Sequence, residues 1–120
     1  MAGTVTVTES VHTSVKKIKW AWTSTAGGAA DQITAAPYYG EVLALMTIPA
    51  AAGNAPTDNY DITITDVEGY DVMQGAGANR DTANTETAVP ATKSVAHGTV
   101  TLNITNAGDA KSGTAILYIR

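Results

Sequence analysis

The last third of the chain constrains the fold most strongly, because its residues alternate between polar and apolar without a break. Residues 99–105 read Thr-Val-Thr-Leu-Asn-Ile-Thr, and residues 114–120 form a second run of strand-forming residues. Between the two runs, residues 106–109 read Asn-Ala-Gly-Asp, which are residue types that form turns. Successive side chains of a β-strand point to opposite faces of a sheet, so this period of two predicts two half-buried strands joined by a turn.

Similar runs upstream predict that the chain is all-β. Further strands are expected at residues 4–8, 16–23, 41–48, 60–65 and 70–73. Residues 32–35 and 88–95 are candidates for a short strand and for an edge strand interrupted by Pro90, and not both are needed for the total. About seven to eight short antiparallel strands, separated by turns every 8–12 residues or so, are typical of a β-sandwich with jelly-roll or Greek-key-like connections. A length of 120 residues suits one domain, so residues 1–120 are interpreted as a single β-sandwich.

The segment 41–48 is the most apolar of the expected strands. Its apolar residues fall on both faces, which indicates a central strand or one that is covered on both sides. A helix over residues 40–52 is the alternative, since Ala, Leu and Met are strong helix formers. Gly40 and Pro49 would leave that helix barely two turns long, so a strand is the preferred interpretation.

The composition predicts a thin core. The chain contains no Phe, and much of its apolar content is Ala, so large side chains must come from Trp, Tyr and the aliphatic residues. Ile18, Trp20 and Trp22 share one face of an expected strand and are assigned to the core. The alternative for the two tryptophans is a platform that stacks against a sugar ring. A thin core favours oligomerisation or docking on a larger assembly.

Charge and cysteine content exclude several classes of protein. The formal net charge is −4, which argues against a nucleic-acid partner because such proteins need a basic surface. The absence of Cys excludes disulfides, thiolate metal sites and cysteine nucleophiles. The N-terminal residues do not resemble a signal peptide, and the longest apolar stretch, near residues 42–52, is too short to span a bilayer. We therefore expect a protein made in the cytoplasm, with no membrane partner.

No motif in the sequence announces a reaction. The Gly-x-Ser-x-Gly and His-Glu-x-x-His patterns are absent, and the Gly-rich run 75–80 lacks the Gly-Lys-Ser/Thr of a phosphate loop. Residues 66–71 carry three acids that invite a calcium site, but their spacing departs from the EF-hand pattern, and Asp with Gly favours a turn. The sequence therefore predicts a protein that is not an enzyme and needs no cofactor or metal.

Three segments are the candidates for contact with a partner. One is a basic strand, one is an aromatic corner between Pro37 and Gly40, and one is the long polar segment 74–86. Tyr is favoured at protein interfaces, and long loops on small β scaffolds are common binding sites. The candidate residues are Lys16, Lys17, Lys19, Tyr38, Tyr39, Asn79, Arg80 and Asp81.

Residues 59–72, 75–80 and 106–120 give the chain a family resemblance. It resembles the small Thr- and Ala-rich structural proteins in the virions of tailed bacteriophages. The resemblance implies a capsid decoration or cement protein that binds the major capsid protein on the outer surface of the virion, as a homo-oligomer such as a dimer or trimer. One alternative is a head–tail connector or tail component. Another is a carbohydrate- or calcium-binding adhesion module built on Trp20, Trp22 and the acidic turn.

Overall fold

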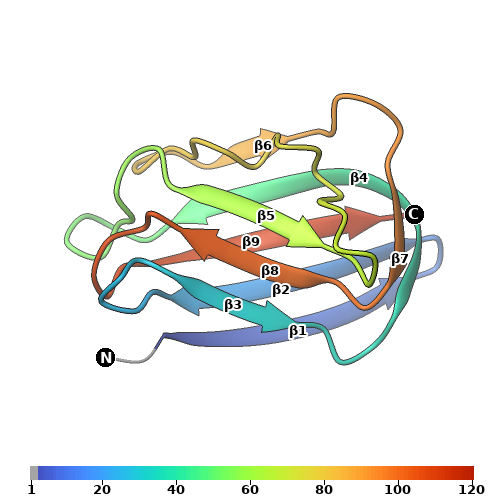
Figure 1. Cartoon of the computed structure of the whole chain (residues 1–120), viewed down its shortest axis with the longest axis horizontal. Helices are drawn as coiled ribbons and strands as arrows, with labels where there is room; N and C mark the ends of the chain where they lie inside the picture. Colours follow the sequence, from blue (N-terminus) through green and yellow to red (C-terminus); the bar gives the residue numbers. More distant parts are fainter. Residues whose placement is uncertain (1–2) are drawn as a thin grey trace.

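Antiparallel strands account for the regular structure of the chain (Figure 1). The computed structural model describes residues 3–120, and this range contains nine β-strands and no α-helix. The strands are β1 (Thr4–His12), β2 (Val15–Thr23), β3 (Ala30–Ile33), β4 (Tyr38–Pro49), β5 (Asp61–Thr65), β6 (Glu86–Ala88), β7 (Val95–Gly98), β8 (Thr101–Thr105) and β9 (Ser112–Ile119). The all-β prediction is confirmed, and the strand total exceeds the expected seven to eight.

The strands form two sheets that pack face to face as a β-sandwich. The larger sheet has the order β1-β2-β9-β4-β6, and β7 pairs with the start of β4. The smaller sheet has the order β3-β8-β5 and lies across the larger one (Figure 1). The last strand, β9, occupies the middle of the larger sheet between β2 and β4, so the strand predicted at the end of the chain is a central one.

The core lies between the sheets and follows the predicted alternation. Trp20 is fully buried and Trp22 is 2% exposed, so the assignment of both tryptophans to the core is confirmed and neither presents a ring face to solvent. Trp22 packs against Tyr60 with ring centroids 5.6 Å apart. The larger sheet also contributes Ile18, Leu45, Leu117 and Ile119, and the smaller sheet contributes Ile62, Ile64, Leu102 and Ile104.

The strands predicted at 4–8 and 41–48 extend further in the structure, as β1 and β4, and two other expected strands are shifted or divided. The strand predicted at 32–35 is β3, which begins at Ala30 because a tight turn over residues 25–28 ends with Gly28 at a φ of +82°. The strand predicted at 88–95 is divided into β6 and β7 by an irregular stretch that contains Pro90. Proline has no N–H to donate to a neighbouring strand, so the pairing stops there.

The strand predicted at 70–73 is wrong, because the Asp71 side chain turns the chain. Its carboxylate accepts hydrogen bonds from the backbone N–H groups of Ile64 at 3.2 Å, Met73 at 3.0 Å and Gly75 at 2.9 Å. Only one bridge, between Thr65 and Asp71, remains of a strand pairing. A short acidic side chain that takes backbone donors in this way competes with sheet formation.

Residues 71–80 run irregularly along the outer edge of β5. The Val72 N–H donates to the Ile64 carbonyl at 2.8 Å, and the Ile62 N–H donates to the Gly77 carbonyl at 2.9 Å. At the far end, Arg80 pairs with Tyr60 as an isolated bridge. The first part of the predicted loop 74–86 therefore covers a sheet edge.

Candidate functional site

Most of the exposed large apolar side chains lie at one end of the sandwich. At this end β1, β3, β5 and β9 finish and β2 and β4 begin (Figure 1). The side chains there are between 41% and 67% exposed. They are Val11, Ile33, Tyr39, Val67, Tyr70 and Val95, and we call this group the apolar end. Single exposed apolar residues are ordinary, but a gathering on one surface is typical of an interaction site.

The two tyrosines of the aromatic corner point in opposite directions at the start of β4. Tyr38 is 5% exposed, and its hydroxyl donates to Glu9 Oε1 at 2.6 Å. Tyr39 is 58% exposed and meets the His97 ring edge-on, with centroids 5.2 Å apart. Strand alternation explains the division, since adjacent side chains face opposite ways. Tyr39 is therefore available to a partner, whereas Tyr38 is buried and bonded to Glu9.

Glu9 of β1 ties the larger sheet to the connection between β3 and β4. Its carboxylate accepts the backbone N–H of Ala35 at 3.0 Å and of Ala36 at 3.1 Å, besides the Tyr38 hydroxyl. Partial burial acts to raise the pKa of Glu9, but the hydrogen bonds from Tyr38, Ala35 and Ala36 outweigh it and lower the pKa. Burial, followed by the bond to Glu9, raises the pKa of Tyr38. The arrangement fixes the backbone on which Tyr39 is displayed.

The three lysines of the basic strand do not share one surface. Lys16 lies at the apolar end, where its Nζ donates to the Tyr39 carbonyl at 3.2 Å. Lys17 and Lys19 alternate with the core residue Ile18, and so they stand on the outer face of the larger sheet. The structure thus brings Lys16 and Tyr39 together and leaves the other two lysines elsewhere.

Asn79, Arg80 and Asp81 lie near the start of β5, at the opposite end of the sandwich from Tyr39. The Arg80 guanidinium donates to the Ala78 carbonyl at 3.1 and 3.2 Å and lies 3.5 Å from Glu86. The Asn79 N–H donates to Asp61 Oδ1 at 3.0 Å.

Asp81 caps the turn that follows. Its carboxylate accepts Asn84 Nδ2 and the Ala83 N–H, both at 2.8 Å. These hydrogen bonds, first from Asn84 and then from Ala83, lower the pKa of Asp81. The polar atoms of residues 79–81 therefore hold their own segment in place, and these residues lie apart from the apolar end.

The acidic stretch 66–71 forms a turn, as the sequence predicts. The Asp66 carboxylate accepts the N–H of Glu68 at 2.9 Å and of Tyr70 at 3.2 Å, and the Gly69 N–H closes the turn on the Asp66 carbonyl at 3.0 Å. Within residues 3–120, no three His, Cys, Asp or Glu side chains gather in a way that fits a metal ion. The turn carries Val67 and Tyr70 to the apolar end.

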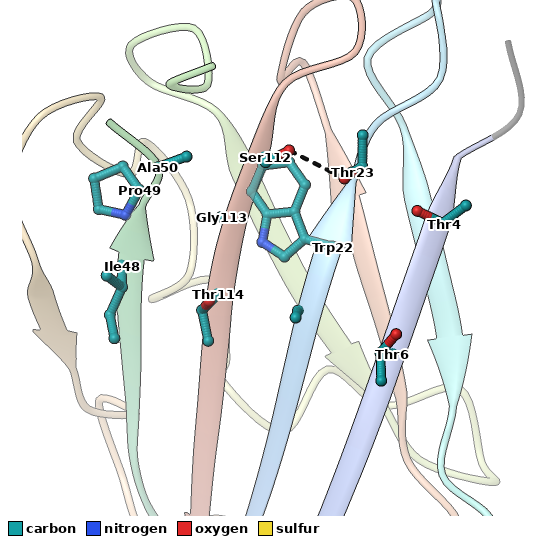
Figure 2. Close-up of a pocket in the computed structure, with 11 residues that line it drawn as sticks. Thr4, Thr6, Trp22, Thr23, Ile48, Pro49, Ala50, Ser112, Gly113 and Thr114 are labelled. Carbon is teal, nitrogen blue, oxygen red and sulfur yellow. Dashed lines mark hydrogen bonds between the residues drawn. The ribbon is translucent and has the colours of Figure 1, made fainter. Parts of the chain in front are cut away.

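An open depression of about 530 Å³ lies on the outer face of the larger sheet (Figure 2). Hydroxyls from three strands line it: Thr4 and Thr6 of β1, Thr23 of β2, and Ser112 and Thr114 of β9. The Thr23 and Ser112 hydroxyls bond each other at 3.0 Å. Its lining contains no acid, base or cation, so it offers a hydroxyl no partner for nucleophilic catalysis.

Sequence reasoning missed five residues of the apolar end, namely Val11, Ile33, Val67, Tyr70 and Val95. The available signal was their place within two residues of a strand end or turn, but they come from four separate segments that only the topology brings together.

In the described part of the chain, no helix has the length and apolar character needed to cross a membrane. Comparison of the chain with protein-family models, curated proteins and solved structures gives no match.

Proposed function

We propose that this chain is a structural protein of a tailed-phage virion that decorates the outer surface of the capsid and stabilises it, without catalysing a reaction. The observation that carries the proposal is the apolar end, which offers a surface for the major capsid protein. The resemblance of residues 59–72 and 106–120 to small virion proteins supports the choice of partner.

The apolar end has the composition of a protein-binding surface. Its centre is apolar and aromatic, and charged groups surround it: Lys16 from β2, and the Glu41–Arg120 pair, whose N and O atoms are 4.0 Å apart. Interfaces commonly combine such a centre with a polar rim. Covering half-exposed side chains of this size contributes about 1 kcal/mol each before the entropic cost of association is subtracted.

Docking of this kind stabilises whatever form of the partner presents the site. A protein that binds the assembled capsid and not its free subunits shifts the equilibrium towards assembly by mass action. Many copies on a symmetric shell repeat the same contact at each equivalent position. A domain with most of its exposed large apolar side chains at one end suits such a role.

Quantitative mass spectrometry of purified virions of the phage that encodes the chain is the first test. The number of copies is measured relative to the major capsid protein. A ratio near one per capsid subunit or capsomer supports decoration. About a dozen copies would instead indicate a place in the connector or tail, whose rings contain far fewer subunits than the capsid. Absence from the virion would overturn the proposal.

Binding to heads that lack the protein tests the surface itself. The double variant Tyr39→Ser, Val95→Ser removes two exposed apolar side chains from the apolar end, and Val89→Ser is the matched control because Val89 is equally exposed but follows β6. We expect co-sedimentation with heads to fall at least tenfold for the double variant and to stay unchanged for the control. Equal binding by all three proteins would exclude the apolar end as the docking surface.

A further inference from the structure

β1 is the longest sheet edge that has no neighbour within residues 3–120. It lies at the margin of the larger sheet, next to β2 alone (Figure 1). The other edges are treated differently: residues 71–80 cover β5, and the edge strands β3, β6 and β7 have only four, three and four residues. β1 has nine residues, and its pairing with β2 runs without a shift from Thr4 to His12.

The hairpin geometry shows which backbone groups face outward from β1. Thr13 and Ser14 form a two-residue connection, so His12 and Val15 are the hydrogen-bonded pair that closes it. Bonding alternates along an antiparallel strand, so the even-numbered residues of β1 bond to β2. The N–H and C=O groups of Val5, Val7, Glu9 and Val11 therefore point to the free edge.

This edge lacks most of the features that usually prevent strand pairing. Natural edge strands are shortened, bulged, covered, or marked with Pro, Lys or an inward-pointing charge. β1 reads Thr-Val-Thr-Val-Thr-Glu-Ser-Val-His, with no Pro, Lys or bulge. Its one acidic residue, Glu9, is already held by Ala35, Ala36 and Tyr38 of the same chain. A nine-residue edge without Pro, Lys or bulge, in a chain that covers or shortens its others, is suited to pairing with another strand.

We propose that a second copy of this chain pairs antiparallel along β1, with Thr8 opposite Thr8 of the partner subunit. This register is the one in which residues 4–12 of both copies overlap completely. It pairs the outward-facing backbone groups of all four residues. Val5 of each copy lies opposite Val11 of the other, and Val7 of each copy lies opposite Glu9 of the other. A register centred on Glu9 would oppose two carboxylates, and one centred on Val7 would leave Val11 without a partner in the strand. Threonine opposite threonine is a favourable cross-strand pair.

The symmetry of the β1 dimer has a consequence for capsid binding, which rests on the proposed function. Antiparallel pairing directs the apolar ends of the two copies to opposite sides of the dimer. Such a dimer carries two docking surfaces and can join two neighbouring capsid subunits. Binding at both ends raises the overall affinity beyond that of either contact alone. The dimer itself stands on the β1 edge and does not require this role.

Sedimentation velocity of the purified chain at about 100 µM tests the dimer, because association follows mass action. We expect a dimer for the wild-type chain. Thr8→Lys places two ammonium groups opposite each other at the centre of the interface, each beside Lys19 of its own β2, and raises the dissociation constant at least tenfold. Thr8→Glu places two carboxylates there and weakens the dimer less, because each lies opposite Lys19 of its own chain. Mixing the two variants restores a dimer, since the introduced ammonium group of one copy then faces the introduced carboxylate of the other. Thr87→Lys is the matched control, because Thr87 is an exposed strand threonine on β6, and it stays dimeric.

Three outcomes would overturn the proposal: a monomeric wild-type chain, a Thr8→Lys variant that remains a dimer, or loss of the dimer in Thr87→Lys as well. Circular dichroism of each variant confirms that the fold is retained. Failure of the dimer and failure of capsid docking are separable, because sedimentation uses the isolated chain and head binding is read with the Tyr39→Ser, Val95→Ser variant.

Discussion

Gly77→Ala tests the attachment of residues 71–80 to β5. An added Cβ would collide with the Ile62 carbonyl oxygen and would lie 3.2 Å from the carbonyl carbon and 3.4 Å from Cβ of the same residue. Neither backbone yields easily, because the Ile62 N–H donates to the Gly77 carbonyl at 2.9 Å and Ile62 is buried in the core. The collision is therefore relieved only if residues 71–80 move away from the strand.

The expected destabilisation follows from the bonds that this movement breaks. The Ile62–Gly77 hydrogen bond is lost first, and the two bonds between Arg80 and residues 59 and 60 are lost if the whole segment lifts. At about 1 kcal/mol for each backbone hydrogen bond, plus the cost of leaving buried groups unpaired, the loss is about 2–4 kcal/mol. For a chain of this length, about 4 °C of Tm corresponds to 1 kcal/mol, so Tm falls by about 8–16 °C.

Thermal unfolding followed by circular dichroism measures the effect, with Gly27→Ala as the control. A Cβ on Gly27 would meet only the Thr25 hydroxyl, at 3.7 Å. The control is expected to keep its stability or to gain up to about 1 kcal/mol by restricting the unfolded chain. If Gly77→Ala unfolds within about 2 °C of the wild type, residues 71–80 are not held against β5, and the contrast between the covered β5 edge and the free β1 edge is lost.

The remaining predictions concern a carboxylate, a buried tyrosine and a tight glycine. Glu9→Gln weakens three hydrogen bonds and costs about 1–2 kcal/mol at pH 7. Folding lowers the pKa of Glu9 from 4.5, so its contribution to stability is present above that pH and disappears as the pH falls through the folded pKa. The free energy of unfolding in urea should therefore decline less from pH 7 to pH 3 in Glu9→Gln than in the wild type. Burial raises the pKa of Tyr60 to about 12, and the nearby Thr47 hydroxyl and Arg80 guanidinium offset this only in part. The unfolded state ionises first as the pH rises above 10, so stability falls from there through pH 12, and this alkaline decline should be smaller in urea titrations of Tyr60→Phe, in which Tyr38 alone of the two still contributes. Gly113→Ala places a Cβ 2.8 Å from Trp22 Cζ2, so a loss of about 1–3 kcal/mol and a shifted tryptophan emission are expected, and unchanged emission would contradict the packing.

The parts of the fold that the sequence predicts well are those in which one face of a strand is buried. In β2 the alternation of Lys17, Ile18, Lys19 and Trp20 identifies both the strand and its inward face. The same holds for β5 and β8, where Ile and Leu alternate with Thr and Asn. A one-residue slip would bury the polar side chains, so the pattern determines the register as well as the face.

The sequence was least informative where side chains replace strand pairing. Nothing in the sequence around Asp71 reveals that its carboxylate will accept a hydrogen bond from the N–H of Ile64 across a turn. The same limit applies to residues 74–86, whose Gly and Asn content predicts a loop but not its path along β5. Such bonds depend on which segments meet in space, and local propensity carries no information on that.

The apolar end and the β1 edge meet at Val11, and this residue connects the two proposals. Val11 is 67% exposed in the single chain, the largest exposed fraction in the apolar end. In the β1 dimer, Val11 opposes Val5 of the partner subunit and is partly covered before any capsid is present. Val95 and Tyr39 lie on β7 and β4, away from the β1 edge, and stay exposed for docking. The substitutions at Thr8 and at Val95 therefore separate dimerisation from docking, whereas Val11→Ser should weaken both, because one side chain belongs to both surfaces.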